Sequence, residues 1–219
     1  MLAKFSYAAT WHVGKHQNIK TIQQAINQCK NGDTVIVEAG NYFEKNLIVN
    51  KSIVLLGIDY PVLDGEKKYE IISVNKDNVI VDGFKLQHSG NSAMNDLAAI
   101  KIYNSRDVII RNNILDDNFF GIYSQYGTNC TISNNQIHAP GKSELQNGNG
   151  IHCWKSDSMR IIGNKVSGHR DGIILNLLPT PLSGEILVNT ISAMVCILCF
   201  RITMHTSAIY SVIMEQALQ

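Results

Sequence analysis

A short motif of hydrophobic, Asn and Gly residues recurs through most of this chain and restricts the folds that it can adopt. Its copies are VDGFKL, IRNNIL, ISNNQI and IIGNKV, at residues 81–86, 110–115, 132–137 and 161–166. A second motif lies between these segments, and its corresponding positions are Ala99, Gly121, Gly150 and Gly172. The spacings are 22 or 29 residues, so the base period is 22, with about seven extra residues where a loop intrudes.

A unit of this length is too small to bury its own hydrophobic face and must stack on its neighbours. Two or three short alternating strands per unit, closed by Asn or Gly, predict an all-β right-handed parallel β-helix over residues 1–173. A leucine-rich repeat is the competing solenoid. Its leucine framework is absent, because the repeated positions here prefer Ile and Val.

The periodicity also predicts which side chains face the core. Asn113, Asn135 and Asn164 are expected to stack as a ladder in successive turns. Cys130 and Cys153 fall at inward positions as small core residues, and Met159 should fill the start of a strand. The expected inward aliphatic side chains are those of Ile110, Ile122, Ile132, Ile151 and Ile161.

Upstream of the repeats, TIQQAINQC predicts a short helix that covers the N-terminal end of the solenoid. Thr21 is the expected N-cap, with Gln24 three residues on. Ile22, Ala25, Ile26 and Cys29 would form its buried face.

The charge balance gives no indication of a nucleic-acid or membrane partner. The formal net charge is +1, and no run of Lys or Arg occurs in the 219 residues. The five cysteines are an odd number without the spacing of a small disulfide scaffold, so free thiols are expected. The first residues, MLAKFSYAATWHVG, lack the hydrophobic region of a complete secretory signal.

The order of several motifs resembles the NosD family. TIQQAI, GDTV, LLG and PVLDG are followed by NVIVDGFKL, NGIHCWKS and GHRDGI, and the resemblance covers about residues 11–173. The first motifs are common to many pectin-lyase-like β-helices, whereas the last two are more specific. The resemblance implies a periplasmic, non-enzymatic accessory protein. It also implies that the protein works with the membrane and ATPase subunits of an ABC transporter, without spanning the membrane itself, to mature the copper sites of nitrous oxide reductase.

Two other functions remain open. A polysaccharide lyase or hydrolase would need clustered carboxylates with His, Arg or Lys on neighbouring rungs, and a carbohydrate-binding β-helix is related to it. Asp116 and Asp117, with Arg111 nearby in sequence, are the nearest candidates. Adjacent strand residues point to opposite faces, and no matching carboxylate is evident one period away, so no catalytic residue is assigned. A purely structural surface solenoid is the third possibility.

A role for copper is implied by the resemblance alone. His152 and His169 are the candidate metal ligands. His152 alternates with two inward residues and should face outward, and His169 lies in the GHRDG turn, where an exposed side chain is expected. Imidazole is a suitable copper ligand.

The composition changes abruptly after Ile173. Residues 1–173 contain 20 Asn and 15 Gly, whereas residues 174–219 contain 2 Asn, 1 Gly and three charged residues. Shifting the reading frame by one base forces Gly codons across the junctions at Met194–Val195 and Met214–Glu215, in phase with the repeat. We therefore predict that 174–219 is an out-of-frame tail and not a domain, and that the CILC motif at 196–199 has no selected function.

Overall fold

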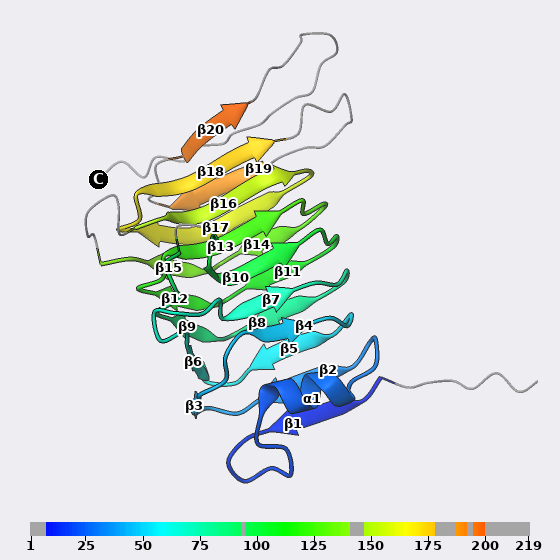
Figure 1. Ribbon diagram of the computed structural model, residues 1–219. Coiled ribbons are helices and arrows are strands. Elements are labelled where there is room, and N and C mark those ends of the chain that lie inside the picture. Colours follow the sequence, from blue (N-terminus) through cyan, green and yellow to red (C-terminus); the bar gives the residue numbers. More distant parts are fainter. Residues whose placement is uncertain (1–7, 93–94, 141–146, 178–186, 192–194, 200–219) are drawn as a thin grey trace, which may run out of the picture.

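The computed structural model describes residues 8–92, 95–140, 147–177, 187–191 and 195–199. The strands stack into a right-handed parallel β-helix of about seven turns, with one short helix at the N-terminal end (Figure 1). The predicted fold class is confirmed.

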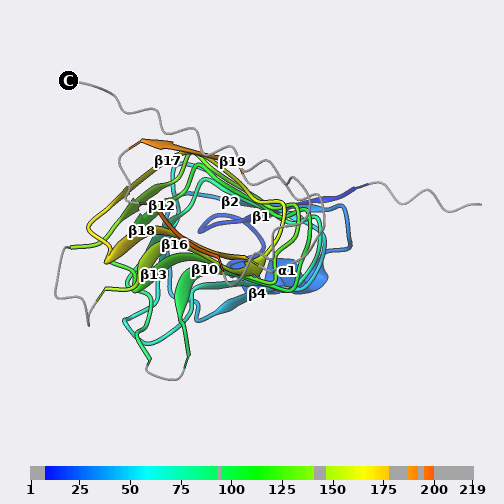
Figure 2. The same ribbon diagram turned by 90° about the horizontal axis from the view of Figure 1, so that it is seen from above.

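All strand pairs are parallel and form two sheets, which enclose the core when viewed along the solenoid (Figure 2). In sheet A the order is β1 (Thr10–Val13), β2 (Thr34–Val37), β5 (Val54–Gly57), β8 (Ile80–Asp82), β11 (Ile109–Arg111), β14 (Thr131–Ser133), β17 (Arg160–Ser167), β15 (Gln136–His138), β12 (Ile114–Asp116), β9 (Lys85–Gln87), β6 (Val62–Asp64) and β3 (Asn41–Tyr42), with β19 (Leu187–Ile191) pairing β17. In sheet B the order is β20 (Val195–Cys199), β18 (Asp171–Leu177), β16 (Asn149–Ser156), β13 (Phe120–Gln125), β10 (Ala98–Tyr103), β7 (Ile72–Val74) and β4 (Leu47–Val49).

The hydrophobic core follows the repeat. Ile110 pairs in register with Ile132, which pairs with Ile161, and Ile122 pairs with Ile151. All five side chains are fully buried, as predicted. The predicted inward positions of Cys130, Cys153 and Met159 are also confirmed. Burial raises the pKa of the Cys130 thiol to about 11, so this thiol stays protonated near neutral pH.

The predicted asparagine ladder is present and buried. The side-chain oxygen of Asn135 accepts hydrogen bonds from Asn113, and that of Asn164 accepts hydrogen bonds from Asn135. Each side-chain amide also donates to a backbone carbonyl. The ladder therefore satisfies backbone groups at a turn where strand pairing is interrupted.

The helix α1 (Ile22–Gln28) lies where the sequence predicts it, and Ile22, Ala25 and Ile26 are buried. Thr21 stands at the N-cap position, but its side chain makes no capping hydrogen bond. The carboxylate of Glu44 instead accepts hydrogen bonds from the first two helical amides. The negative charge of Glu44 makes it a strong acceptor at the positive end of the helix.

Contacts at both ends of α1 also fix it to the solenoid. The Lys51 ammonium donates to the carbonyl oxygens of Ile26, Asn27 and Cys29. The Gln23 amide exchanges two hydrogen bonds with the backbone of Ile48, on the free edge of β4. These contacts cover a sheet edge that would otherwise be available for pairing.

Strand pairing continues beyond residue 173. That position lies inside β18, and β20 pairs with β18 through Ile173 and Val195, 22 residues apart. The described part of residues 174–219 therefore keeps the strand spacing of the solenoid. The side chains of Cys196 and Cys199 lie outside the described residues, as does Met194. The out-of-frame origin of this segment stays a prediction.

Candidate functional site

One corner of this solenoid carries a cluster of charged side chains, where sheet A ends and the chain enters the next strand of sheet B. The loops there differ in length, whereas the strands on either side keep their register. Their described residues are 65–71, 88–92, 95–97, 117–119, 139–140, 147–148 and 168–170. Variable loops on a rigid scaffold are the usual place for binding residues.

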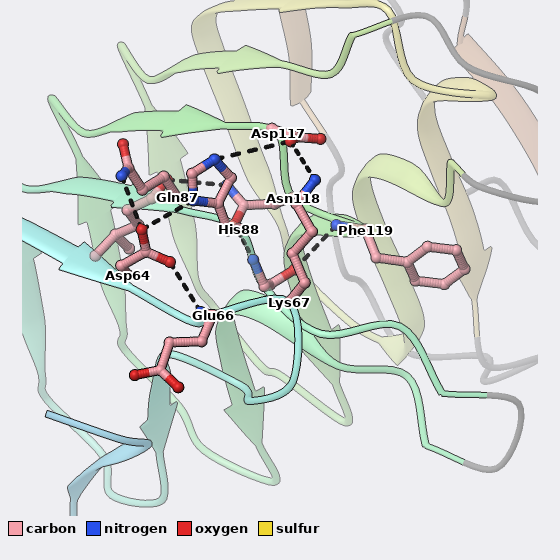
Figure 3. A network of polar contacts seen from close by, with 10 residues as sticks. Asp64, Glu66, Lys67, Gln87, His88, Asp117, Asn118 and Phe119 are labelled. Atoms are coloured by element: carbon pink, nitrogen blue, oxygen red, sulfur yellow. Dashed lines mark hydrogen bonds and ion pairs between the residues drawn. The ribbon is translucent and has the colours of Figure 1, made fainter. Parts of the chain in front are cut away.

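A cluster of Asp64, Lys67, His88 and Asp117 joins three rungs at this corner (Figure 3). The His88 Nδ1 atom lies 2.9 Å from an Asp64 carboxylate oxygen, and its Nε2 atom lies 3.8 Å from Asp117. The Lys67 ammonium lies 2.6 Å from the same Asp117 oxygen. We call these four residues the acid–imidazole cluster.

The environment of Asp64 favours its ionised form. Partial burial raises the pKa of Asp64, but hydrogen bonds from Gln87, the Glu66 amide and His88 together outweigh burial and lower that pKa. The contact with the ionised Asp64 carboxylate fixes the orientation of the His88 ring. The Nε2 atom is directed toward Asp117, which already pairs with Lys67.

Sequence reasoning identified Asp117 but missed Asp64 and His88. Their spacings of 24 and 29 residues depart from the 22-residue period because the intervening loops differ in length. His88 and Asp117 both adopt left-handed backbone conformations, with φ of 58° and 49°, in turns that follow strands. Asp116 lies in β12, in register with Gln87 and His138.

Arg111 does not join the acid–imidazole cluster. Its guanidinium lies 2.6 Å from the Asp82 carboxylate, one rung away within sheet A. The possible grouping of Arg111 with Asp116 and Asp117 is therefore not formed.

A pocket of about 390 Å³ opens beside the same corner, over sheet B. Its buried acidic residue is Glu70, which accepts hydrogen bonds from Ser73 and from the Tyr103 hydroxyl. Burial raises the pKa of Glu70, and contacts with Ser73, Lys101 and Tyr103 only partly offset this effect. The pocket is lined by Asn46, Glu70, Asn95, Asp96, Leu97, Lys101, Tyr103 and Gln125.

Aromatic rings extend from this pocket along the outer face of sheet B. The Lys101 ammonium lies 4.9 Å from the ring centroid of Tyr103 and 4.8 Å from that of Tyr123. His152 stacks on Tyr123 with a centroid separation of 4.8 Å, and Trp154 meets His152 edge-on. His152 faces outward, as predicted, and burial lowers its pKa.

His169 differs from its expected exposed state. Both ring nitrogens are buried and have no hydrogen-bond partner among the residues that the structure describes. Burial lowers the pKa of His169 to about 4, so the ring is neutral near neutral pH. The reason is local packing: a Cβ built on Gly150 would lie 3.5 Å from the His169 ring. A neutral imidazole with a free lone pair retains the chemistry of a metal ligand.

The described ranges contain no group of three or more His, Cys, Asp or Glu side chains placed to hold a metal. They therefore do not fit a three-ligand metal centre. That His152 and His169 bind a metal as individual ligands stays a prediction.

Comparison with curated proteins finds one similar sequence among those that match. The chain is 26% identical over 136 residues to the probable ABC transporter binding protein NosD of Pseudomonas aeruginosa, which covers 61% of this chain and 32% of that protein. This chain therefore spans about a third of the curated relative that it matches.

Two solved structures are also similar. A rhamnogalacturonan lyase covers 86% of this chain and 65% of its own, with a TM-score of 0.48 and 13% identity. A pectin methylesterase in complex with a hexasaccharide covers 88% and 81%, with a TM-score of 0.44 and 12% identity.

Within the described residues, no helix is both long enough and hydrophobic enough to cross a membrane.

The sequence model of the family described as "right handed beta helix region" matches residues 12–166 of this chain and, in a second alignment, residues 70–192. With most of its length matched and a parallel solenoid for a structure, the chain belongs to the right-handed beta helix family.

Proposed function

We propose that this chain is a NosD-like accessory protein that works with an ABC transporter in maturing the copper sites of nitrous oxide reductase, in the periplasm. The supporting observation is where the most specific motifs fall in the fold. GIHCWKS forms most of β16, and GHRDGI forms the turn into β18 and its first residues. Both contribute to one surface.

That surface, which we call the β16–β18 patch, consists of His152, Trp154, Arg170 and Asp171, with the buried Asn149 in contact with Arg170. Arg170 donates hydrogen bonds to Asn149 and Asp171 and so joins the two strands at the corner. The Arg170 side chain remains 44% exposed. Aromatic side chains and arginine are enriched at protein interfaces, which supports a partner-binding role for this patch.

Copper is the cargo of the proposed assembly, and His152 and His169 are the residues proposed to contact it. Both imidazoles are neutral near neutral pH, because burial lowers each pKa. Neutral imidazole binds copper, whereas the protonated form does not.

The test is binding of the purified chain to the ABC transporter subunits and to copper-free nitrous oxide reductase. We expect Arg170→Ala to weaken binding roughly tenfold, as for a central interface arginine. Arg106→Ala is the matched control, since Arg106 is 61% exposed on the turn between β10 and β11. Absence of binding to every component, or equal losses from the two variants, would contradict the proposal. In a separate titration, His152→Ala and His169→Ala should each weaken copper binding.

A further inference from the structure

The acid–imidazole cluster joins three consecutive rungs at the corner described above. His88 follows β9 directly, Asp64 ends β6 one rung before it, and Asp117 follows β12 one rung after it. Figure 3 shows the His88 ring between the two carboxylates, and Lys67 reaches Asp117 from a position 50 residues earlier in the chain. A change of charge on this one ring can therefore act on three turns.

The two ring nitrogens of His88 differ in their contacts. Nδ1 lies 2.9 Å from an Asp64 oxygen, at hydrogen-bond distance, whereas Nε2 lies 3.8 Å from an Asp117 oxygen, beyond that distance. Asp64 has a lowered pKa and is ionised near neutral pH, and an ionised carboxylate only accepts hydrogen bonds. The proton of a neutral His88 ring therefore belongs on Nδ1, and Nε2 faces Asp117 with a lone pair.

A proton added to this ring goes to Nε2, on the side of Asp117. The protonated ring has two N–H donors and can donate to both carboxylates, whereas the neutral ring donates to one. Because a charge-assisted hydrogen bond is short, the contact between Nε2 and Asp117 should close from 3.8 Å to below about 3 Å. Imidazole is the side chain that changes charge between about pH 5 and 8. The corner therefore gains a bond between rungs in mild acid.

The charged groups on the neighbouring turns leave this response intact. The Lys67 ammonium lies against Asp117, so that carboxylate would be shared between an ammonium and an imidazolium. Glu66 donates its backbone amide to the other carboxylate of the cluster, and its own carboxylate is directed away from the ring (Figure 3). Asp116 accepts a hydrogen bond from the His88 amide through its backbone carbonyl. A protonated His88 would thus meet two carboxylates and share one of them with a single ammonium.

Neutral hydrogen bonds already position the turns on either side of His88. The Ser89 amide donates to the Asn118 side chain, and the Phe119 amide donates to the Ser89 hydroxyl. On the preceding rung, the Gly90 amide donates to the Tyr69 carbonyl. The charged contact can therefore close through a small movement of side chains, without a rearrangement of the backbone.

We propose that the acid–imidazole cluster is a pH-sensitive clasp, in which protonation of His88 adds a bond from Nε2 to Asp117 and fastens the three turns together. The segment that follows the His88 turn supplies residues 95–97 to the wall of the pocket beside Glu70. Acid limits the movement of the start of this segment, and a rise in pH releases it. The clasp goes beyond the proposed role in copper-site maturation and does not rest on it.

Hydrogen exchange at single amides of the full chain tests the clasp. The reporters are the amides of Ser89 and Phe119, which donate between the turns, and the Thr128 amide, in the turn between β13 and β14, is the reference. After correction for the intrinsic pH dependence of exchange, protection of the two reporters should be roughly threefold higher at about pH 5.5 than at about pH 7.5, as for one surface ion pair. Protection at Thr128 should show no such rise. Equal or lower protection of the reporters in acid would overturn the proposal.

Variants separate the clasp from other effects of pH. His88→Asn has no titrating proton, and Asn tolerates the left-handed backbone at this position, where φ is 58°. Asp117→Asn keeps the shape of the second partner and removes its charge. Both variants should lose most of the pH dependence at Ser89 and Phe119, whereas His16→Ala, at an exposed position between β1 and α1, should retain it. Full pH dependence in either cluster variant would refute the assignment.

NMR of the imidazole nitrogens in the unmodified protein removes the dependence on variant folding. Which nitrogen of a neutral ring carries the proton is set by the hydrogen bonds that the ring makes. Above the pH at which the ring loses its charge, the nitrogen chemical shifts of His88 should therefore be those of the Nδ1–H tautomer. An Nε2–H tautomer would contradict the clasp, because Nε2 would then already donate toward Asp117 without added acid.

Discussion

The side-chain oxygen of Asn135 lies 3.0 Å from two nitrogens of Asn113, its backbone amide and its side-chain amide. Asn135→Ala would leave the buried amide of Asn113 without this acceptor and would remove the donor to the Ile110 carbonyl. Each unsatisfied buried group costs about 1–3 kcal/mol, so we expect the free energy of unfolding to fall by about 3 kcal/mol. Urea unfolding followed by circular dichroism measures this change.

The control for this variant is Gln136→Ala, on the exposed neighbour in β15. Its free energy of unfolding should change by less than about 0.5 kcal/mol. Similar losses in the two variants would mean that the ladder has no special contribution to stability.

The repeated glycine at position 150 is explained by close packing between the two sheets. A Cβ at Gly150 would lie 2.3 Å from a methyl carbon of Val166 and 2.7 Å from the Gly172 carbonyl oxygen. We expect Gly150→Ala to lower the free energy of unfolding by about 2–3 kcal/mol. The double variant Gly150→Ala/Val166→Ala should show a favourable coupling energy, because it removes one of the two clashes. Strict additivity in this cycle would contradict the packing explanation.

The regular part of the fold could be predicted because each prediction depends on the spacing alone. The 22-residue period places Ile110 against Ile132 and Asn113 against Asn135, independently of how the loops are folded. The irregular part depends on contacts between loops of unequal length. Glu44 replaces Thr21 as the capping side chain, and no local pattern around α1 indicates that contact.

The candidate site was only partly predictable for the same reason. The outward position of His152 follows from strand alternation. Glu70 precedes β7 in a loop without a recurring motif, and its burial depends on Ser73 and on Tyr103, 33 residues later. His169 was expected to be exposed because it lies in a turn, but its ring packs beside Gly150.

The reading-frame prediction can be checked directly. The pairing of β18 with β20 continues the period of the preceding rungs. It therefore agrees both with an in-frame and with an out-of-frame origin of residues 174–219. Resequencing the gene should reveal a one-base shift near the codons for Ile173 and Ile174. An uninterrupted frame, together with a native peptide spanning residues 172–182, would disprove it.

Asp33 fixes the first strand of the solenoid to the rest. Its carboxylate accepts hydrogen bonds from the backbone amides of Lys30 and Ala9 and from the Trp11 indole. These bonds lower the pKa of Asp33. A carboxylate with a lowered folded-state pKa contributes stability above its unfolded value, near 4, and loses it as the pH falls through the folded value.

We therefore expect β1 to loosen below about pH 4, before the remaining rungs unfold. Hydrogen exchange at the Ala9 amide and Trp11 fluorescence report this step. Asp33→Asn should loosen β1 at neutral pH as well, whereas Asp59→Asn, in an exposed turn, should not. Acid unfolding of β1 together with all the other strands would contradict a local role for Asp33.

The buried ring of His169 gives the opposite end of the solenoid its own pH dependence. Its folded-state pKa is about 4, below the ordinary value near 6.5, so the unfolded chain binds more protons between these values. Stability is therefore complete above about pH 6.5 and is lost progressively as the pH falls toward 4, by up to about 3 kcal/mol. His169→Leu removes the titrating group and introduces no unsatisfied polar atom, so the slope of stability against pH over this range should decrease. His16→Ala, at an exposed position between β1 and α1, should retain the slope. Urea unfolding at intervals between pH 4 and 7 measures both slopes, and an unchanged slope for His169→Leu would show that the ring titrates in the folded protein as it does in the unfolded chain.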